Sequence, residues 1–223
     1  PAGVLYDPYH PLNEPVEILA LFKQGQPVTA PQVNDQVEVL LPKTWFYVES
    51  GGQVSDTGQI IGAKGNNWTI EVTGMRKPAA GVIVHLGVVV EGTPQVGDPA
   101  FMQVDLERRT KIMRNHTATH LLHAALQTVL GHHARQAGSL VAPDHLRFDF
   151  IRPQAVTRAE LMEIEAKVNQ AILANYHLNI TQKPLTQAID EGAMALFGEK
   201  YEDVVRTIVI GDEDVLSYEL CGG

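Results

Sequence analysis

The sequence predicts an α+β protein in two parts, and three observations carry this prediction. Residues 16–104 contain short apolar or alternating runs separated by turn residues, which is typical of a small barrel or sandwich. Residues 106–130 form one long run with apolar residues at helical spacing. Residues beyond 134 mix strand-like runs with two shorter helical stretches. We predict a small antiparallel β-barrel-like subdomain over residues 1–104, followed over residues 105–223 by an α/β subdomain with a long central helix on an antiparallel sheet.

The first part contains a proline-rich extended segment over residues 1–15 and then a series of short strands. Turn residues such as Gly74 and the run 91–94 separate the strands. The predicted strands are residues 16–22, 36–41, 59–63, 68–73, 82–86 and 100–104.

The segment 44–58 differs from the strands around it because it contains the pair Gly51-Gly52 between polar side chains. A glycine pair lets the backbone approach a ligand or another segment closely. The other interpretation is a tight hairpin turn that leaves Glu49, Gln53 and Asp56 in solvent.

The central helix is predicted from Leu106 to about Leu130, with Asp105 as its N-cap and Gly131 just past its end. His116 and His120 are four residues apart and therefore lie on one face of the helix. That spacing allows two imidazoles to reach one metal ion, although two hydrogen-bonded or solvated histidines are an equal alternative. The single cysteine, Cys221, is the candidate for a ligand of another type.

The second part continues with strands at 135–141 and 146–151, joined across residues 142–144. Thr157 and Glu160 form a capping box that opens a helix to about residue 174. The remaining predicted elements are a strand at 178–183, an amphipathic stretch at 186–195, and strands at 204–210 and 215–220 around a turn at 211–214.

Composition narrows the class of protein. The net charge of −9 argues against a domain that grips nucleic-acid backbone broadly. No apolar run approaches the roughly 20 residues that cross a bilayer, and one cysteine cannot form an internal disulfide, so we expect a cytoplasmic location. Four basic residues cluster directly before the two histidines: Arg108, Arg109, Lys111 and Arg114. One interpretation of this cluster is a solvated helix face, and the other is contact with a nucleic-acid end.

Five separated motifs, in this order, resemble the editing domain of alanyl-tRNA synthetases and the related AlaX-type deacylases. The family's Phe-Tyr-x-Glu-Ser-Gly-Gly-Gln-x-x-Asp-x-Gly is present at 46–58, and its Arg-Asn-His-x-Ala-Thr-His at 114–120. Its Gln-x-Gly-Ser is present at 136–139, followed by Leu-Arg-Phe-Asp-Phe at 146–150. Its Cys-Gly-Gly-Thr-His begins at Cys221, and the sequence stops after the second glycine.

The resemblance implies a proofreading aminoacyl-tRNA hydrolase that cleaves the ester of tRNA(Ala) mischarged with serine or glycine. It implies a Zn²⁺ site with His116, His120 and Cys221 as ligands, whose fourth ligand lies past Gly223. We therefore expect this stretch to come from a longer ATP-dependent ligase, to hold zinc partially and to be weakly active. Two glycines follow Cys221, so we also expect a loosely held ligand there.

The resemblance also assigns roles around the metal. It implies that Gln136 and Thr119 are catalytic, with Thr119 also reading the serine hydroxyl, whereas Thr119 could instead bond back to its own helical turn. His123 is interpreted as a helix-packing residue. The residues implied to bind substrate are Thr119, Glu49, Gly51, Gly52, Gln53 and Arg114.

The implied partners are the acceptor end of tRNA(Ala) carrying serine or glycine and the remaining synthetase domains, with no membrane. Two alternatives stay open at this point. One is a non-catalytic module that binds the acceptor end and contains a structural zinc. The other is a hydrolase for a small amino-acid ester without RNA.

Overall fold

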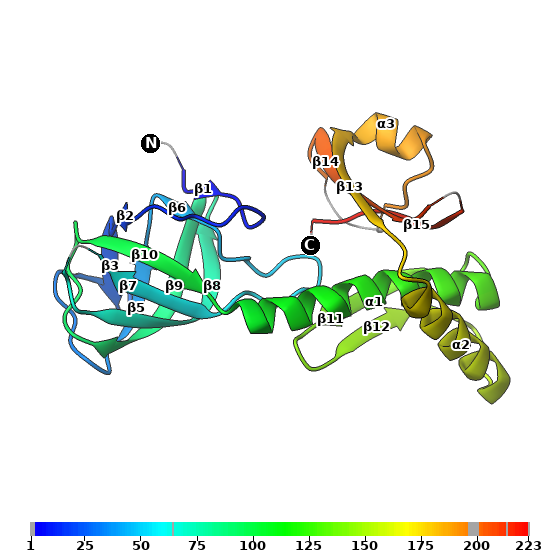
Figure 1. Cartoon of the computed structure of the whole chain (residues 1–223), viewed down its shortest axis with the longest axis horizontal. Helices are drawn as coiled ribbons and strands as arrows, with labels where there is room; N and C mark the ends of the chain where they lie inside the picture. The colour runs from blue at the N-terminus through cyan, green and yellow to red at the C-terminus, as the bar shows by residue number, and fades with distance from the viewer. Residues whose placement is uncertain (1–2, 64, 196–200, 213, 223) are drawn as a thin grey trace. The chain divides into compact units, whose positions relative to one another are not determined.

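The computed structural model describes residues 3–63, 65–195, 201–212 and 214–222, and it shows a mixed α+β protein with few helices (Figure 1). The chain divides into two compact units: Pro1–Glu49 with Val54–Thr110, and Ser50–Gln53 with Lys111–Gly223. The predicted boundary between residues 104 and 105 stays a prediction. None of the helices in the described part of the chain has the length and apolar character needed to cross a membrane.

The first unit is built around a curled antiparallel sheet that forms half of a barrel (Figure 1). Alternate side chains along its strands enter one core, where Val39, Ile60 and Ile70 are fully buried. A short parallel pair, β1 (Leu5–Tyr6) with β6 (Lys43–Thr44), completes the unit. In pairing order the strands of the sheet are β2 (Val16–Glu17), β10 (Pro99–Val104), β7 (Gly58–Gly62), β8 (Thr69–Ala79), β9 (Val82–Glu91), β5 (Gln36–Leu40), β3 (Ala20–Lys23) and β4 (Gln26–Val28).

Three predicted strands, at 36–41, 59–63 and 100–104, match β5, β7 and β10 closely. The prediction of a turn at Gly74 is wrong, because β8 runs through it to Ala79. The register between β8 and β9 shifts between Val72 and Gly74, so a β-bulge accommodates the glycine inside the strand.

Asp56 and Arg109 form a buried ion pair inside the first unit. The backbone N–H of Tyr47 also donates to the Asp56 carboxylate at 2.6 Å, and the guanidinium lies 4.8 Å from the Trp45 ring centroid. The interpretation that Asp56 faces solvent is therefore wrong. Arg109 is likewise not part of a solvated basic face, and Arg108 donates to the Ser55 carbonyl.

The second unit contains most of the long helix, α1 (Leu106–Leu130), whose residues up to Thr110 belong to the first unit. Its predicted ends are confirmed: the Asp105 carboxylate accepts from the Arg108 N–H at 2.9 Å, and Gly131 has a φ of +97°. Leu126 and Leu130 pack in a cluster with Ile164 of α2 (Arg158–Ala174). The capping box predicted for α2 is present, with its side-chain–backbone bonds in both directions between Thr157 and Glu160.

Two antiparallel sheets accompany these helices. The first is the hairpin β11 (Gln136–Val141) and β12 (Leu146–Phe150). The second contains β13 (Leu178–Pro184), β14 (Val204–Gly211) and β15 (Val215–Leu220) in that order. The predicted stretch 186–195 is a short helix, α3 (Leu185–Asp190), which ends before Gly192 at a φ of +92°. The turn predicted at 211–214 includes residue 213, which lies outside the described residues.

Candidate metal centre

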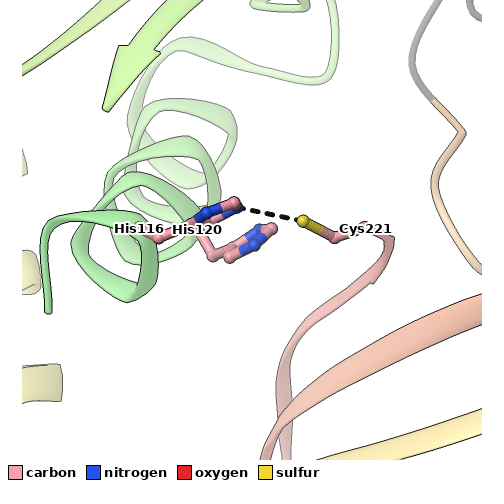
Figure 2. Close-up of side chains that lie close together, drawn as sticks. All are labelled: His116, His120 and Cys221. Atoms are coloured by element: carbon pink, nitrogen blue, oxygen red, sulfur yellow. Dashed lines mark hydrogen bonds between the residues drawn. The ribbon is translucent and has the colours of Figure 1, made fainter. Parts of the chain in front are cut away.

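His116, His120 and Cys221 lie together in the second unit (Figure 2). The two imidazoles project from one face of α1, with ring centroids 5.2 Å apart and planes at 23°. Cys221 follows β15, and its Sγ is 3.0 Å from Nε2 of His116. The three potential ligand atoms all lie within 4.8 Å of one another. The two histidines predicted to share a helical face and the predicted cysteine therefore lie together in the structure.

These residues fit a zinc ion. Nε2 of His120 is buried and has no hydrogen-bond partner among the described residues, which is unfavourable for a polar atom unless something binds its lone pair. Zinc–nitrogen and zinc–sulfur bonds of about 2.0–2.3 Å place tetrahedral ligands roughly 3.3–3.7 Å apart, so small side-chain adjustments are enough. Two imidazoles and one thiolate are also ligand types that zinc favours.

The backbone of Cys221 is held on both sides by Arg206 of β14. The Cys221 N–H donates to the Arg206 carbonyl at 3.1 Å, and the Arg206 guanidinium donates to the Cys221 carbonyl at 3.0 Å. The expectation of a loosely held Cys221 is therefore wrong, because one backbone hydrogen bond and one side-chain hydrogen bond tie this residue to β14.

The charges around the site favour a thiolate. Burial alone would raise the pKa of Cys221, but the hydrogen bond from His116 and the interaction with His120 outweigh it and lower the pKa to about 5. Burial would lower the pKa of His120, whereas Cys221 and Glu219 together raise it to about 10. The same histidines hold the pKa of Glu219 well below its usual range despite its burial. A metal ion would replace the His120 proton as the positive partner of the thiolate.

Each metal-facing histidine has a partner on its other nitrogen. Nδ1 of His116 lies 2.5 Å from Oε1 of Gln53, and Nδ1 of His120 lies 2.9 Å from Oε2 of Glu219. The interpretation that Gln53 faces solvent is wrong, since its side chain is buried against His116.

Glu219 was missed at the sequence level. The available signal was an acidic residue two positions before the only cysteine, a spacing that puts both side chains on one side of an extended backbone.

The residues Ser50–Gln53, which we call the glycine segment, are attached to β11 by close backbone contact. The Val141 N–H donates to the Gly52 carbonyl at 2.7 Å. Gly52 has a φ of +81°, and a Cβ placed on it would lie 2.7 Å from the Ser139 carbonyl oxygen. The Ser139 hydroxyl donates to the Gly51 carbonyl at 3.4 Å and accepts from Nε2 of Gln136 at 3.1 Å. A chain of contacts thus connects Gln136, the glycine pair and, through Gln53, the candidate ligand His116.

The other predicted site residues occupy distinct environments. The Thr119 hydroxyl is buried and donates to the Asn115 carbonyl at 2.8 Å, the bond within its own turn that was the alternative interpretation. Glu49 and Arg114 are exposed. His123 is buried and its Nδ1 lies 3.2 Å from Glu219, which agrees with a packing residue rather than a ligand.

The sequence is similar to those of known proteins. Residues 6–108 match the family model described as tRNA synthetases class II (A). The chain is 47% identical over 208 residues to an alanine–tRNA ligase of Xanthomonas campestris pv. campestris (strain B100), covering 93% of this chain and 23% of that protein. It is 50% identical over 194 residues to an alanine–tRNA ligase of Roseiflexus sp. (strain RS-1), covering 87% of this chain and 21% of that protein.

The similarity extends past the family-model match, because it covers 93% of the chain. The chain spans less than a quarter of the length of these relatives. The matches together show that this chain belongs to the alanyl-tRNA synthetase family and corresponds to one segment of its members.

Proposed function

We propose that this chain is the editing domain of an alanyl-tRNA synthetase and hydrolyses the ester of tRNA(Ala) mischarged with serine or glycine. In this proposal residues 1–104 form a barrel-like subdomain, and residues 105–223 form the subdomain that carries the catalytic site. The observation that carries the proposal is the convergence of two buried histidines, His116 and His120, with Cys221 from a distant part of the sequence. The similarity to alanine–tRNA ligases supports tRNA as the partner.

A zinc ion bound there would supply Lewis-acid polarisation of the ester carbonyl or a bound water with a pKa of about 7. His116 and His120 would hold it through their Nε2 atoms, and Cys221 through its sulfur. The pKa of Cys221, lowered to about 5, keeps that ligand ionised at neutral pH without a strong base. His116, His120 and Cys221 are thus placed for metal binding, and the metal would displace the proton that His120 otherwise carries.

Discrimination between serine and alanine needs a site that forms a hydrogen bond with the serine hydroxyl. An apolar pocket distinguishes the two by only about 100-fold, whereas a buried polar partner left unpaired by alanine discriminates much more strongly. Thr119 precedes His120 and donates its own proton to Asn115, so its oxygen lone pairs remain to accept from a substrate hydroxyl. We assign this role to Thr119.

Gln136 and the glycine segment are assigned to the same reaction. The side-chain amide of Gln136 donates to Ser139, and the Ser139 hydroxyl donates to the Gly51 carbonyl. Gln53, in the same segment as Gly51, contacts His116. Exposed Glu49 and Arg114, with the backbone of Gly51 and Gly52, are the groups we assign to the terminal adenosine. Substrate binding by a glycine pair is reasonable because no Cβ blocks the approach of a ligand to the backbone.

Deacylation of tRNA charged with serine, glycine or alanine tests the proposal. We expect the zinc-loaded chain to release serine and glycine faster than alanine, and His120→Ala to abolish the difference. A non-catalytic module with a structural zinc would retain tRNA in a gel shift and release no amino acid. Cleavage of a seryl-adenosine ester as fast as the charged tRNA would instead indicate an esterase that does not need the RNA.

A further inference from the structure

The two histidines that face the candidate metal position are each held from behind by a buried side chain. His116 contacts Gln53 through Nδ1 at 2.5 Å, and His120 contacts Glu219 through Nδ1 at 2.9 Å. Both Gln53 and Glu219 are about 5% exposed. Neither residue offers an atom to the three-ligand cluster, so their contribution acts through the histidines.

These contacts determine which ring nitrogen carries the proton. A carboxylate oxygen and an amide oxygen only accept hydrogen bonds, so each Nδ1 must carry a hydrogen. In a neutral imidazole Nε2 then has a free lone pair, which is the form that binds a metal. Partners of this kind also fix the ring orientation and raise the basicity of the ligand nitrogen.

We propose that Glu219 and Gln53 are positioning residues of the metal centre, which set the tautomer and orientation of His120 and His116 respectively. This inference rests on the metal centre of the proposed function. Under this proposal the zinc affinity of the site depends partly on Gln53, so the glycine segment contributes to metal binding as well as to substrate binding.

Glu219 is itself fixed by its surroundings. Its Oε1 accepts from the Ser217 hydroxyl at 2.9 Å and lies 3.2 Å from Nδ1 of His123, while its Oε2 faces His120. The pairing of β15 with β14, which places Glu219 opposite Ile208, fixes the backbone from which it projects. The carboxylate therefore has little freedom to leave His120.

The charge of Glu219 also balances the site. A divalent ion bound by two neutral imidazoles and one thiolate has a net charge of about +1 in a buried environment, which is costly unless it is compensated. The Glu219 carboxylate, one hydrogen bond from His120, brings the sum to about zero. An amide at the same position would preserve the shape and lose this compensation.

His123 shows why the neighbouring histidine is not a further ligand. Its Nδ1 faces Glu219 and its Nε2 lies 3.1 Å from the Gln127 side-chain amide, so both ring nitrogens are occupied. His120 differs because its Nε2 has no hydrogen-bond partner in the described part of the chain.

Zinc affinity, measured by competition with a chromophoric chelator, tests the proposal without any tRNA. We expect Glu219→Gln and Gln53→Met each to weaken zinc binding by about 10–100-fold, the usual effect of losing such a partner. Gln53→Glu keeps an acceptor opposite His116 and should bind zinc more tightly than Gln53→Met. Glu191→Gln removes a carboxylate from an exposed ion pair with Lys183 and is the matched control, with no expected change.

Cobalt substitution separates positioning from general stability. In the Glu219→Gln and Gln53→Met variants, the visible d–d bands of bound Co²⁺ should shift while the thiolate-to-metal absorption of Cys221 is retained. If Glu219→Gln does not fold, Gln53→Met decides the question, because Gln53 lies outside the helices and named strands. Unchanged zinc affinity in either folded variant, or a wild-type chain that binds neither metal, would overturn the proposal. A wild-type chain that binds zinc and does not deacylate tRNA contradicts only the proposed function.

Discussion

Gln53 and His116 are in contact through side-chain atoms 2.5 Å apart, although 63 positions separate them in the sequence. The contact joins the glycine segment to the helix that carries both candidate histidine ligands. The compact unit that contains most of α1 includes Ser50–Gln53, while the residues on either side of this segment belong to the first unit. A short turn thus contributes a side chain to the metal centre, and this relationship leads to the first prediction.

Gly52→Ala should destabilise the chain more than Gly51→Ala. Both glycines have a positive φ, at +81° and +58°, so each alanine bears a backbone cost of about 1–2 kcal/mol. Only at position 52 would the new Cβ also meet Ser139, at 2.7 Å from its carbonyl oxygen, whereas nothing lies within 4 Å of position 51. Urea unfolding of the two variants measures the difference. Equal losses of unfolding free energy would show that the close approach to β11 is not maintained.

Thr119→Val should reduce hydrolysis of Ser-tRNA more than that of Gly-tRNA. The substitution preserves shape and removes the oxygen that we assign to the serine hydroxyl, a loss of about 1–3 kcal/mol for one buried hydrogen bond. Single-turnover rates on both substrates measure the selectivity. Thr119→Ser is the control, because it keeps the hydroxyl that donates to Asn115. Parallel losses on both substrates would assign Thr119 to helix structure alone.

The unfolding free energy of the metal-free chain should be highest between about pH 6.5 and 9. The pKa of Cys221 is lowered from 9.0 to about 5 on folding, so its contribution is present above pH 9 and is lost as the pH falls through 5. The pKa of His120 is raised from 6.5 to about 10, so its contribution is present below pH 6.5 and is lost as the pH rises through 10.

Chemical denaturation across this pH range measures that profile. In Cys221→Ser the increase in stability between pH 5 and 6.5 should be reduced. Thiolate absorbance near 240 nm, outside the range of tyrosine ionisation, should titrate near pH 5 in the folded wild-type chain. A thiolate that appears only near its ordinary pKa would contradict the buried interaction with His116.

Asp56→Ala should destabilise the first unit strongly. Removing the carboxylate leaves the Arg109 guanidinium, whose side chain is only 14% exposed, without its charged partner, which typically costs 3–5 kcal/mol. The comparison is Glu38→Ala, which breaks the more exposed pair with Arg76 and should cost about 1 kcal/mol or less. Thermal and urea unfolding measure both losses. A loss at Asp56 no larger than that at Glu38 would contradict the ion pair as a stabilising element of the unit.

Local signals in the sequence predicted most elements well, and long-range contacts explain what they missed. The ends of α1 were predictable because Asp105 and Gly131 cap it by contacts within one turn, and the capping box at Thr157 and Glu160 is equally local. Gly74 was predicted to be a turn and instead lies inside β8, because the bulge that accommodates it depends on pairing with β9.

The candidate ligands could be proposed because His116 and His120 share a helical face and Cys221 is the single cysteine, and the resemblance assigned all three to one metal. Their partners could not be proposed in the same way. Glu219 and Gln53 reach the histidines across 99 and 63 positions of sequence, through strand pairing and a backbone contact that no local pattern encodes. The bond from Thr119 to Asn115 was foreseen as an alternative because it lies within one turn.

The most direct test of the central claim is the rate of serine release from Ser-tRNA(Ala), measured on one preparation with its zinc content determined. We predict release above the buffer rate that increases with bound zinc, disappears after chelation, returns on adding zinc, and is absent in Cys221→Ala. Release that is unaffected by chelation, or no release from a zinc-loaded chain that retains the tRNA, would contradict a metal-dependent deacylase built on His116, His120 and Cys221.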